Sequence, residues 1–307
     1  MKVLFGTDGS RYSLAAARFL AHWLRLSGAR VDLVTAVAGS PLNPRRRYGK
    51  RESLEDRWRT VAERWQGRTA KPLESHGHRV ERMVRRGHPS RVLPEMAATG
   101  EYDLVVAGAK GRGQTPFFDV GSVARALLEH APTPVLMIRE RDPKGRGRQQ
   151  PSFTDPFRIL IPTDGKPHSS HAARWFLGRF RIENAELDLV TAAEELTSEA
   201  VGALPPEERS RVRGEAEKSA RKRLNALANE LGAAPPPTNP RLLEGRPAEA
   251  VVAAAEADEA DLIVLGSRGG GEVPERRMGS VALEIARSAP CSILVVRESA
   301  PLGEPGT

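Results

Sequence analysis

The apolar positions of this chain fall into two kinds of block that alternate along its length. Short apolar runs, such as residues 2–5 and 104–107, predict buried β-strands. Longer stretches between them carry apolar residues every three or four positions, which predicts helices with one buried face. Strands that alternate with helices indicate a parallel sheet covered on both faces.

This series of elements occurs twice, in the same order. Each half predicts a Rossmann-like domain, a five-stranded, parallel, doubly wound sheet flanked by helices, and the chain holds two such domains in tandem. The segment between the halves is rich in Arg, Gly, Gln and Pro, which is typical of a linker. The expected divisions are a first domain at 1–140, a linker at 141–156, a second domain at 157–299 and a tail at 300–307. The expected strands are 2–5, 31–37, 79–85, 104–107 and 134–138 in the first half, with 158–161, 187–193, 241–243, 262–265 and 292–296 in the second.

The long charged helix of each half shows an apolar stripe. In the first half we expect Leu54, Trp58, Val61 and Trp65 to face the core. The stripe of the second half comprises Val212, Ala216, Leu224, Leu227 and Leu231. Shorter helices are expected to begin near Pro89 and Pro247, because proline is favoured in the first turn of a helix.

A glycine signature follows the fourth strand of each half. It reads Gly108-x2-Gly111-x9-Gly121-Ser122 in the first half and Gly266-x2-Gly269-x9-Gly279-Ser280 in the second. Glycines allow a backbone to approach an anion closely, and a Gly-Ser pair at a helix start offers free N–H groups to phosphate. Two copies in register are stronger evidence than one.

An aspartate follows the first strand of each half, Asp8 and Asp164. A doubly wound sheet brings the carboxyl ends of its first and fourth strands together, so each aspartate should meet its glycine loop. The simpler interpretation is an aspartate that caps a helix beside a tight turn. Its recurrence opposite a glycine loop favours contact with a nucleotide.

Composition and charge narrow the class of protein. The 307 residues are 39% hydrophobic and 28% charged, which is ordinary for a globular protein. Residues 1–150 hold 28 Lys and Arg against 15 Asp and Glu, hence +13, and the remainder holds 19 against 24, hence −5. Because many of these charges fall in expected loops without interleaved aromatics, we expect a solvated surface rather than nucleic-acid binding. The single Cys291, the early polar residues and the lack of long apolar runs predict a cytoplasmic protein without a membrane span.

With these motifs assembled, both halves resemble the universal stress protein family, specifically its ATP-binding branch, in tandem form. The resemblance rests on the glycine signature, the Thr-Asp-Gly turn after the first strand and the Ala-Pro before the fifth. It implies that Asp8 and Asp164 bind the adenosine part and that Val37 offers backbone contacts to adenine. It implies further that the loop glycines pass near ribose and phosphates, while the helix starts hold the phosphates. The implied ATP site residues are Thr7, Asp8, Val37, Gly108, Lys110, Gly111, Gly121, Ser122 and Val123, with Thr163, Asp164, Gly266, Arg268, Gly269, Gly279, Ser280 and Val281.

Three points within this resemblance qualify the expected site. The family often has Ser or Thr two places after the signature serine, where this chain has Ala124 and Ala282, so one phosphate hydroxyl is missing in each half. Ala193 stands at the position that corresponds to Val37. Lys110 and Arg268 share one loop position and face either phosphate or solvent, two readings that the sequence leaves equal.

The resemblance implies a cytoplasmic stress-response protein that binds ATP, with or without Mg²⁺, at a site in each domain. It implies a nucleotide-dependent signalling or interaction module, non-enzymatic or with only slow hydrolysis. Family members commonly pair through their fifth strands, so an intrachain pseudo-dimer and a further homodimer are expected.

Two alternatives stay open. One is a nucleotide-processing enzyme, either a slow ATPase or a relative of the nucleotidyl-transferases. The transferase needs a histidine box or a Ser-Gly-Gly motif after the first strand, whereas His76-Gly77-His78 precedes the third strand and is expected to form a surface loop. The other is an interaction module that keeps the fold and binds no ligand.

Overall fold

The protein divides into two compact units, Met1–Glu140 and Arg141–Thr307, each considered by itself below. The structure, a computed structural model, describes residues 1–23, 28–37, 54–111, 120–139, 156–165, 167–180, 184–192, 203–231, 238–268 and 278–302. Of the expected linker at 141–156 only Pro156 is described, and the expected tail at 300–307 is described as far as Leu302.

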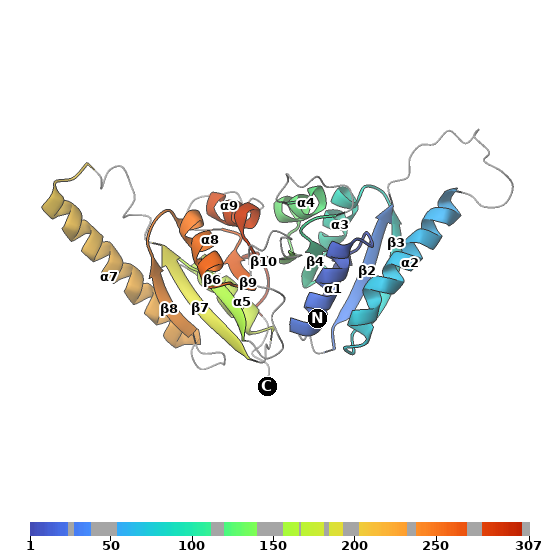
Figure 1. Ribbon diagram of the computed structural model, residues 1–307, viewed down its shortest axis with the longest axis horizontal. Coiled ribbons are helices and arrows are strands. Elements are labelled where there is room, and N and C mark those ends of the chain that lie inside the picture. The colour runs from blue at the N-terminus through green and yellow to red at the C-terminus, as the bar shows by residue number, and fades with distance from the viewer. Residues whose placement is uncertain are drawn as a thin grey trace. The chain divides into compact units, whose positions relative to one another are not determined.

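The first unit is a parallel sheet with helices on both faces, as the alternating pattern predicts (Figure 1). Its strands lie in the order β3-β2-β1-β4-β5, so the chain runs to one side of β1 and then returns to the other. Helices α1 and α2 contact each other on one face, and α3 and α4 contact each other on the opposite face. The elements are β1 Lys2–Gly6, α1 Arg11–Trp23, β2 Arg30–Val37, α2 Leu54–Glu74, β3 Arg79–Arg86, α3 Pro89–Ala97, β4 Leu104–Gly108, α4 Ser122–His130 and β5 Val135–Ile138.

The second unit repeats this topology, with strand order β8-β7-β6-β9-β10 and every pair parallel. The strand β8 starts at Thr238, three residues before the expected start at Arg241, and it contains Pro240. A proline is tolerated here because β8 lies at the edge of its unit's sheet. The elements are β6 Phe157–Pro162, α5 Pro167–Leu177, β7 Ala185–Ala192, α7 Pro206–Leu231, β8 Thr238–Leu243, α8 Pro247–Ala257, β9 Leu262–Gly266, α9 Ser280–Ser288 and β10 Ser292–Val296.

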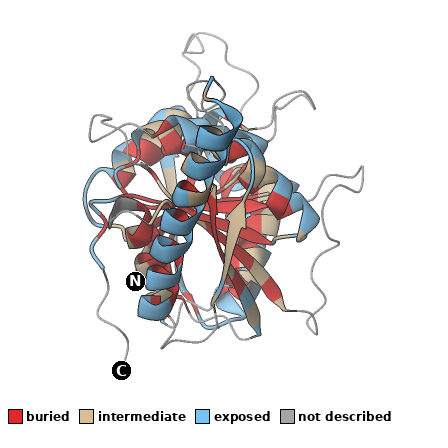
Figure 2. Cartoon of the chain, turned by 90° about the vertical axis from the view of Figure 1, so that its left-hand side faces the viewer, coloured by how far each residue is buried: buried red, intermediate tan, exposed pale blue. Residues whose placement is uncertain are grey.

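The central strands β1, β4, β6 and β9 are nearly continuous apolar runs, and their apolar side chains form the core of each unit. The outward face of α7 is mostly exposed, while the strands that it contacts, β7 and β8, are for the most part buried or half-buried (Figure 2). Its buried positions include Ala216, Leu224, Leu227 and Leu231, which confirms the stripe expected there apart from the half-buried Val212. Cys291 is buried, as expected of a packed residue.

The apolar stripe expected on α2 is confirmed only in part: Val61 and Trp65 are half-buried, Trp58 is exposed, and the side chain of Leu54 lies outside the described residues. The Trp58 side chain is 47% exposed, and the buried positions are instead Ala62, Gln66, Thr69, Ala70 and Leu73. The fully buried face of the helix lies one position further along than the large apolar residues indicate. Gln66 lies on this face and donates hydrogen bonds to the carbonyl oxygens of Leu33 at 3.2 Å and Met83 at 2.6 Å. A buried polar side chain that is fully hydrogen-bonded is as compatible with the core as an apolar one.

The described helices include none long and apolar enough to cross a lipid bilayer.

Candidate nucleotide-binding sites

The turn after β1 holds Asp8 in a fixed position. The N–H of Gly9 donates to Thr7 Oγ1 at 3.2 Å, and the N–H of Ser10 donates to Asp8 Oδ1 at 3.0 Å. Gly9 has φ +66°, a left-handed conformation that favours glycine, and a Cβ there would lie 2.2 Å from the Trp65 ring. Any other residue at this position would push the turn, and Asp8 with it, away from the sheet.

The second unit builds the same turn after β6. The N–H of Gly165, at φ +72°, donates to Thr163 Oγ1 at 3.0 Å. Here the aspartate has an additional partner, because Ser169 Oγ donates to Asp164 Oδ1 at 2.6 Å. Arg223 of α7 also donates to the backbone carbonyl of Asp164, at 3.1 Å.

The glycine loop after β4 reaches Asp8, as the doubly wound order predicts. A Cβ built on Gly111 would lie 2.9 Å from Asp8 Oδ2, so the carboxylate rests directly against the glycine backbone. A Cβ on Gly108 would lie 3.1 Å from Tyr12 Cβ and 3.2 Å from the carbonyl oxygen of Lys110. Gly111 therefore allows close packing against the aspartate, and Gly108 allows close packing against Tyr12 and Lys110.

Each loop ends at the start of a helix. Gly121 is the N-cap of α4 and Gly279 that of α9, both in extended conformation and neither with a capping side-chain hydrogen bond. The N–H of Gly121 donates to the carbonyl of Ala109 at 2.7 Å, and that of Gly279 donates to Ser267 at 2.8 Å. The first-turn N–H groups of a helix have no partner within the helix and form its positive end, which is where anions bind.

In the first unit these parts enclose a pocket of about 740 Å³, within the usual range for small-molecule sites. Of the residues expected in this half, all but Val37 line it, and Val34 and Ala36 of β2 take the place given to Val37. The lining consists of Gly6, Thr7, Asp8, Ser13, Val34, Ala36, His88, Pro89, Leu93, Ala107, Gly108, Lys110, Gly111, Val120, Gly121, Ser122, Val123, Ala124 and Arg125.

The corresponding pocket of the second unit measures about 340 Å³. All the expected residues line it except Gly269, which lies outside the described residues, as does Ala193. The lining consists of Pro162, Thr163, Asp164, Ser169, Val190, Thr191, Ala192, Pro247, Val251, Leu265, Gly266, Arg268, Gly279, Ser280, Val281, Ala282 and Ile285.

The two alanines that depart from the family pattern are part of the pockets. Ala124 and Ala282 both line their pockets, in the first turns of α4 and α9. A hydroxyl at either position would face the space beside the helix start. Each pocket therefore has an alanine at the position where the family often has serine or threonine.

Sequence reasoning missed three polar residues of the first pocket, Ser13, His88 and Arg125. His88 is the N-cap of α3, and its Nδ1 lies 2.7 Å from Ser90 Oγ. Its position at the carboxyl end of β3, directly before Pro89, was the available signal, since pockets in such sheets lie at the carboxyl ends of strands. Arg125 follows the signature serine by three places and pairs with Glu129 at 2.8 Å.

Lys110 and Arg268, the basic residues at the same position of the two loops, differ in their ion pairs. Arg268 forms an ion pair with Glu298 at 3.0 Å, whereas Lys110 makes no ion pair with any described residue. Burial, with a smaller contribution from nearby Arg268, lowers the pKa of Arg297 to about 10. The second loop therefore uses its cation in an internal pair, and the first leaves its lysine at the pocket.

The His76-Gly77-His78 segment is only in part the surface loop that was expected. His76 is exposed, but His78 is 8% exposed, and burial lowers its pKa, with a smaller effect from His76. Neither ring nitrogen of His78 has a hydrogen-bond partner among the described residues. All the residues that the structure describes, taken together, contain no group of three or more His, Cys, Asp or Glu arranged to hold a metal ion.

Comparison with known proteins agrees with this architecture. The universal stress protein family matches residues 1–139 and again residues 157–297. A universal stress protein of Thermus aquaticus is 36% identical over 139 residues, which cover 45% of this chain and 97% of that protein. One of Mycolicibacterium smegmatis is 28% identical over 300 residues, which cover 96% of both chains.

The fold is also found among solved structures. The crystal structure of a universal stress protein from Archaeoglobus fulgidus covers 97% of this chain and 98% of its own, with a TM-score of 0.66 and 18% identity. By sequence, a universal stress protein of Mycobacterium tuberculosis is 28% identical over 309 residues, which cover 97% of this chain and 96% of that protein. The chain thus belongs to the universal stress protein family, as a tandem form with two copies of the family's domain.

Proposed function

We propose that the protein binds ATP at the glycine loop of each unit and acts in the cytoplasm as a nucleotide-dependent module of a stress response. The observation that supports this most directly is the contact between Asp8 and Gly111 at one end of a pocket whose other end is the start of α4. A carboxylate suits ribose hydroxyls, which donate hydrogen bonds, and a helix start suits phosphates. The pocket of the second unit has the same parts.

Mg²⁺ would accompany ATP mainly through the phosphate oxygens. Magnesium is commonly bound by one or two carboxylates together with substrate phosphates. Asp8 and Asp164 are the carboxylates that line the two pockets, and both are assigned here to the ribose rather than to a metal ion. We therefore expect Mg²⁺ to modulate affinity rather than to be required for it.

We expect non-enzymatic behaviour, with slow hydrolysis at most. Efficient phosphoryl transfer needs a residue that orients the attacking group and charges that stabilise the transferred phosphoryl. Incubation with ATP and measurement of released phosphate tests this expectation. Turnover at rates typical of enzymes, abolished by a substitution in a glycine loop, would favour the alternative of a nucleotide-processing enzyme.

The decisive experiment identifies the nucleotide. Mass spectrometry of small molecules released from the purified, denatured protein is expected to show ATP, and titration calorimetry is expected to rank ATP above GTP, AMP and cyclic AMP. The double variant Gly121→Val, Gly279→Val places side chains at the helix starts and should abolish binding. Equal titration heats for this variant and the wild type would refute the proposal and leave the ligand-free module.

We further propose that the two units pair through their fifth strands. In each unit β5 or β10 lies at one end of that unit's own strand order, and an apolar edge strand tends to acquire a partner. Pairing within one chain would give a pseudo-dimer, which a second chain could extend to a homodimer. Cross-linking between cysteines introduced at Leu136 and Leu294, with the oligomeric state measured by light scattering, tests both steps.

A further inference from the structure

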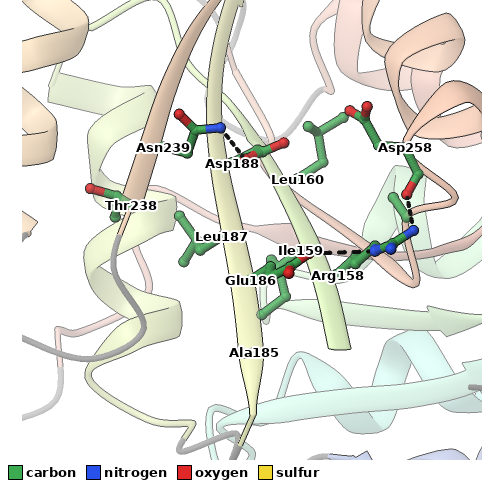
Figure 3. A pocket seen from close by; sticks show the side chains of 11 residues that line it. Arg158, Ile159, Leu160, Ala185, Glu186, Leu187, Asp188, Thr238, Asn239 and Asp258 are labelled. Carbon is green, nitrogen blue, oxygen red and sulfur yellow. Dashed lines mark hydrogen bonds and ion pairs between the residues drawn. The ribbon is translucent and has the colours of Figure 1, made fainter. Parts of the chain in front are cut away.

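The second unit has another hollow, of about 640 Å³, at the amino ends of β6, β7 and β8 (Figure 3). It lies at the end of the sheet opposite to the glycine loop, whose pocket is lined by the carboxyl ends of the strands. In Figure 3 Leu160, Asp188 and Asp258 surround the space beside β7. The lining consists of Arg158, Ile159, Leu160, Ala185, Glu186, Leu187, Asp188, Thr238, Asn239, Asp258 and Ala260.

The first unit fills the same place with a tyrosine side chain. Tyr102 Oη donates to Asp32 Oδ2 at 3.0 Å, and Lys2 Nζ lies 4.7 Å from the centre of the tyrosine ring. The ring therefore spans the distance from Lys2 on β1 to Asp32 on β2. It also shields the carboxylate, since the Asp32 side chain is only 2% exposed.

The two places correspond by backbone geometry. The N–H of Lys2 donates to Asp103 Oδ2 at 2.7 Å, and the N–H of Arg158 donates to Asp261 Oδ2 at 2.9 Å. Tyr102 and Ala260 are the residues directly before those two aspartates. The strand registers agree as well, since Leu4 pairs with Asp32 and Leu160 pairs with Asp188. Ala260 consequently stands where Tyr102 stands, and it lacks the ring.

The second unit replaces the hydrogen bond of the tyrosine but not its volume. Arg241 Nη1 donates to Asp188 Oδ2 at 2.6 Å, and Asn239 Nδ2 donates to Asp188 Oδ1 at 3.0 Å. The Asp188 side chain is nevertheless 23% exposed, against 2% for Asp32. A carboxylate has about four acceptor positions, so Asp188 can accept a further hydrogen bond from a molecule in the hollow.

The charge around the hollow favours a cation. Three carboxylates lie there, those of Glu186, Asp188 and Asp258. Two guanidinium groups oppose them. Arg158 pairs with Glu186 at 3.4 Å and lies 3.7 Å from a fourth carboxylate, that of Glu259, while Arg241 bridges Asp188 and Asp258. An organic amine would offset the remaining negative charge, and a carboxylate-bearing molecule would add to it.

We propose that this hollow is a binding site for a small phenol that carries a positively charged amine. The ring lies over Leu160 in the position that Tyr102 occupies in the first unit, and the phenol O–H donates to Asp188. The amine joins the ion pairs that Glu186 makes with Arg158 and Asp258 makes with Arg241. The site is separate from the glycine loop and does not depend on nucleotide binding.

Tyramine is the probe, since it is the tyrosine side chain extended by an amine, and 4-hydroxyphenylacetate is its anionic counterpart. Titration of the full chain is expected to show saturable, low-millimolar binding of tyramine and at least tenfold weaker binding of the anion. Saturating ATP should leave the affinity for tyramine unchanged. Equal affinity for the two probes, or competition between tyramine and ATP, would overturn the proposal.

The variant Ala260→Tyr supplies the missing ring. It is expected to abolish tyramine binding and to raise the melting temperature, whereas Ala253→Tyr, at an exposed position of α8, should leave binding unchanged. If Ala260→Tyr fails to fold, nuclear Overhauser effects between tyramine ring protons and the Leu160 methyl groups of the wild type provide the test. Wild-type affinity in a folded Ala260→Tyr variant, or Overhauser effects only to residues elsewhere, would refute the site.

Discussion

Ser169 Oγ donates a 2.6 Å hydrogen bond to Asp164 Oδ1, whereas Asp8 Oδ1 in the first unit accepts a 3.0 Å hydrogen bond from the backbone N–H of Ser10. A short hydrogen bond from a hydroxyl to a carboxylate is strong, and it competes with a ligand for the same oxygen. The two units thus share a fold and a motif, but they present their aspartates differently.

We therefore predict that the first site binds ATP more tightly. Its pocket measures about 740 Å³ against 340 Å³, and Lys110 faces it without the ion pair that Arg268 makes with Glu298. In the full chain, Asp8→Ala should remove the tighter phase of an ATP titration and Asp164→Ala the weaker one. Loss of the tighter phase from Asp164→Ala would show that the order is reversed.

Gly111→Ala should weaken ATP binding with little effect on stability. The added Cβ would lie 2.9 Å from Asp8 Oδ2, so the carboxylate must turn away, which a flexible side chain can do at small cost to folding. We expect at least a tenfold loss of ATP affinity in the first site by calorimetry. The matched control is Gly67→Ala in α2, where the nearest atom is 3.9 Å from the new Cβ and the helix should gain about 0.5–1 kcal/mol.

Restoring a hydroxyl at the helix start should strengthen phosphate binding. Ala124 lines the first pocket, and serine is close to alanine in size, so Ala124→Ser should add one hydrogen bond worth about 1 kcal/mol. That energy corresponds to roughly a fivefold increase in ATP affinity. Ala126→Ser, on the same helix but outside the pocket lining, should leave the affinity unchanged, and an equal gain in both variants would contradict the argument.

Acid should destabilise the first unit through His78. Burial lowers the pKa of this side chain in the folded state below the ordinary 6.5, so the unfolded chain takes up a proton that the folded chain does not. Stability from this group is present above about pH 6.5 and is lost as the pH falls below it. The free energy of unfolding should fall less steeply from pH 7 to pH 5 in His78→Leu than in the wild type.

Chemical denaturation at several pH values measures this difference. The exposed His130→Leu serves as the control and should keep the wild-type dependence on pH. A His78→Leu variant with the wild-type dependence would show that His78 is not responsible.

The sheet and the glycine loops could be predicted from the sequence because their signals are local and occur twice. Apolar runs define β1, β4, β6 and β9, and glycine spacing defines the loops. The face of α2 could not be predicted, since Gln66 is buried through hydrogen bonds to β2 and β3 that no periodicity reveals. His88 was missed for a similar reason, because its place in the pocket depends on how β3 lies beside β2. The hollow beside Ala260 could not be predicted, because it depends on how β6, β7 and β8 lie beside one another.

Pro240 has a consequence for how the protein avoids uncontrolled self-association. A strand at the edge of a sheet offers backbone groups to any extended segment that approaches it, and such contacts can propagate from molecule to molecule. Pro240 lacks an N–H, so a chain that added along β8 would find one donor missing in the middle of the strand. We expect that replacing this residue with valine would leave the fold intact and make concentrated solutions of the protein prone to fibre formation.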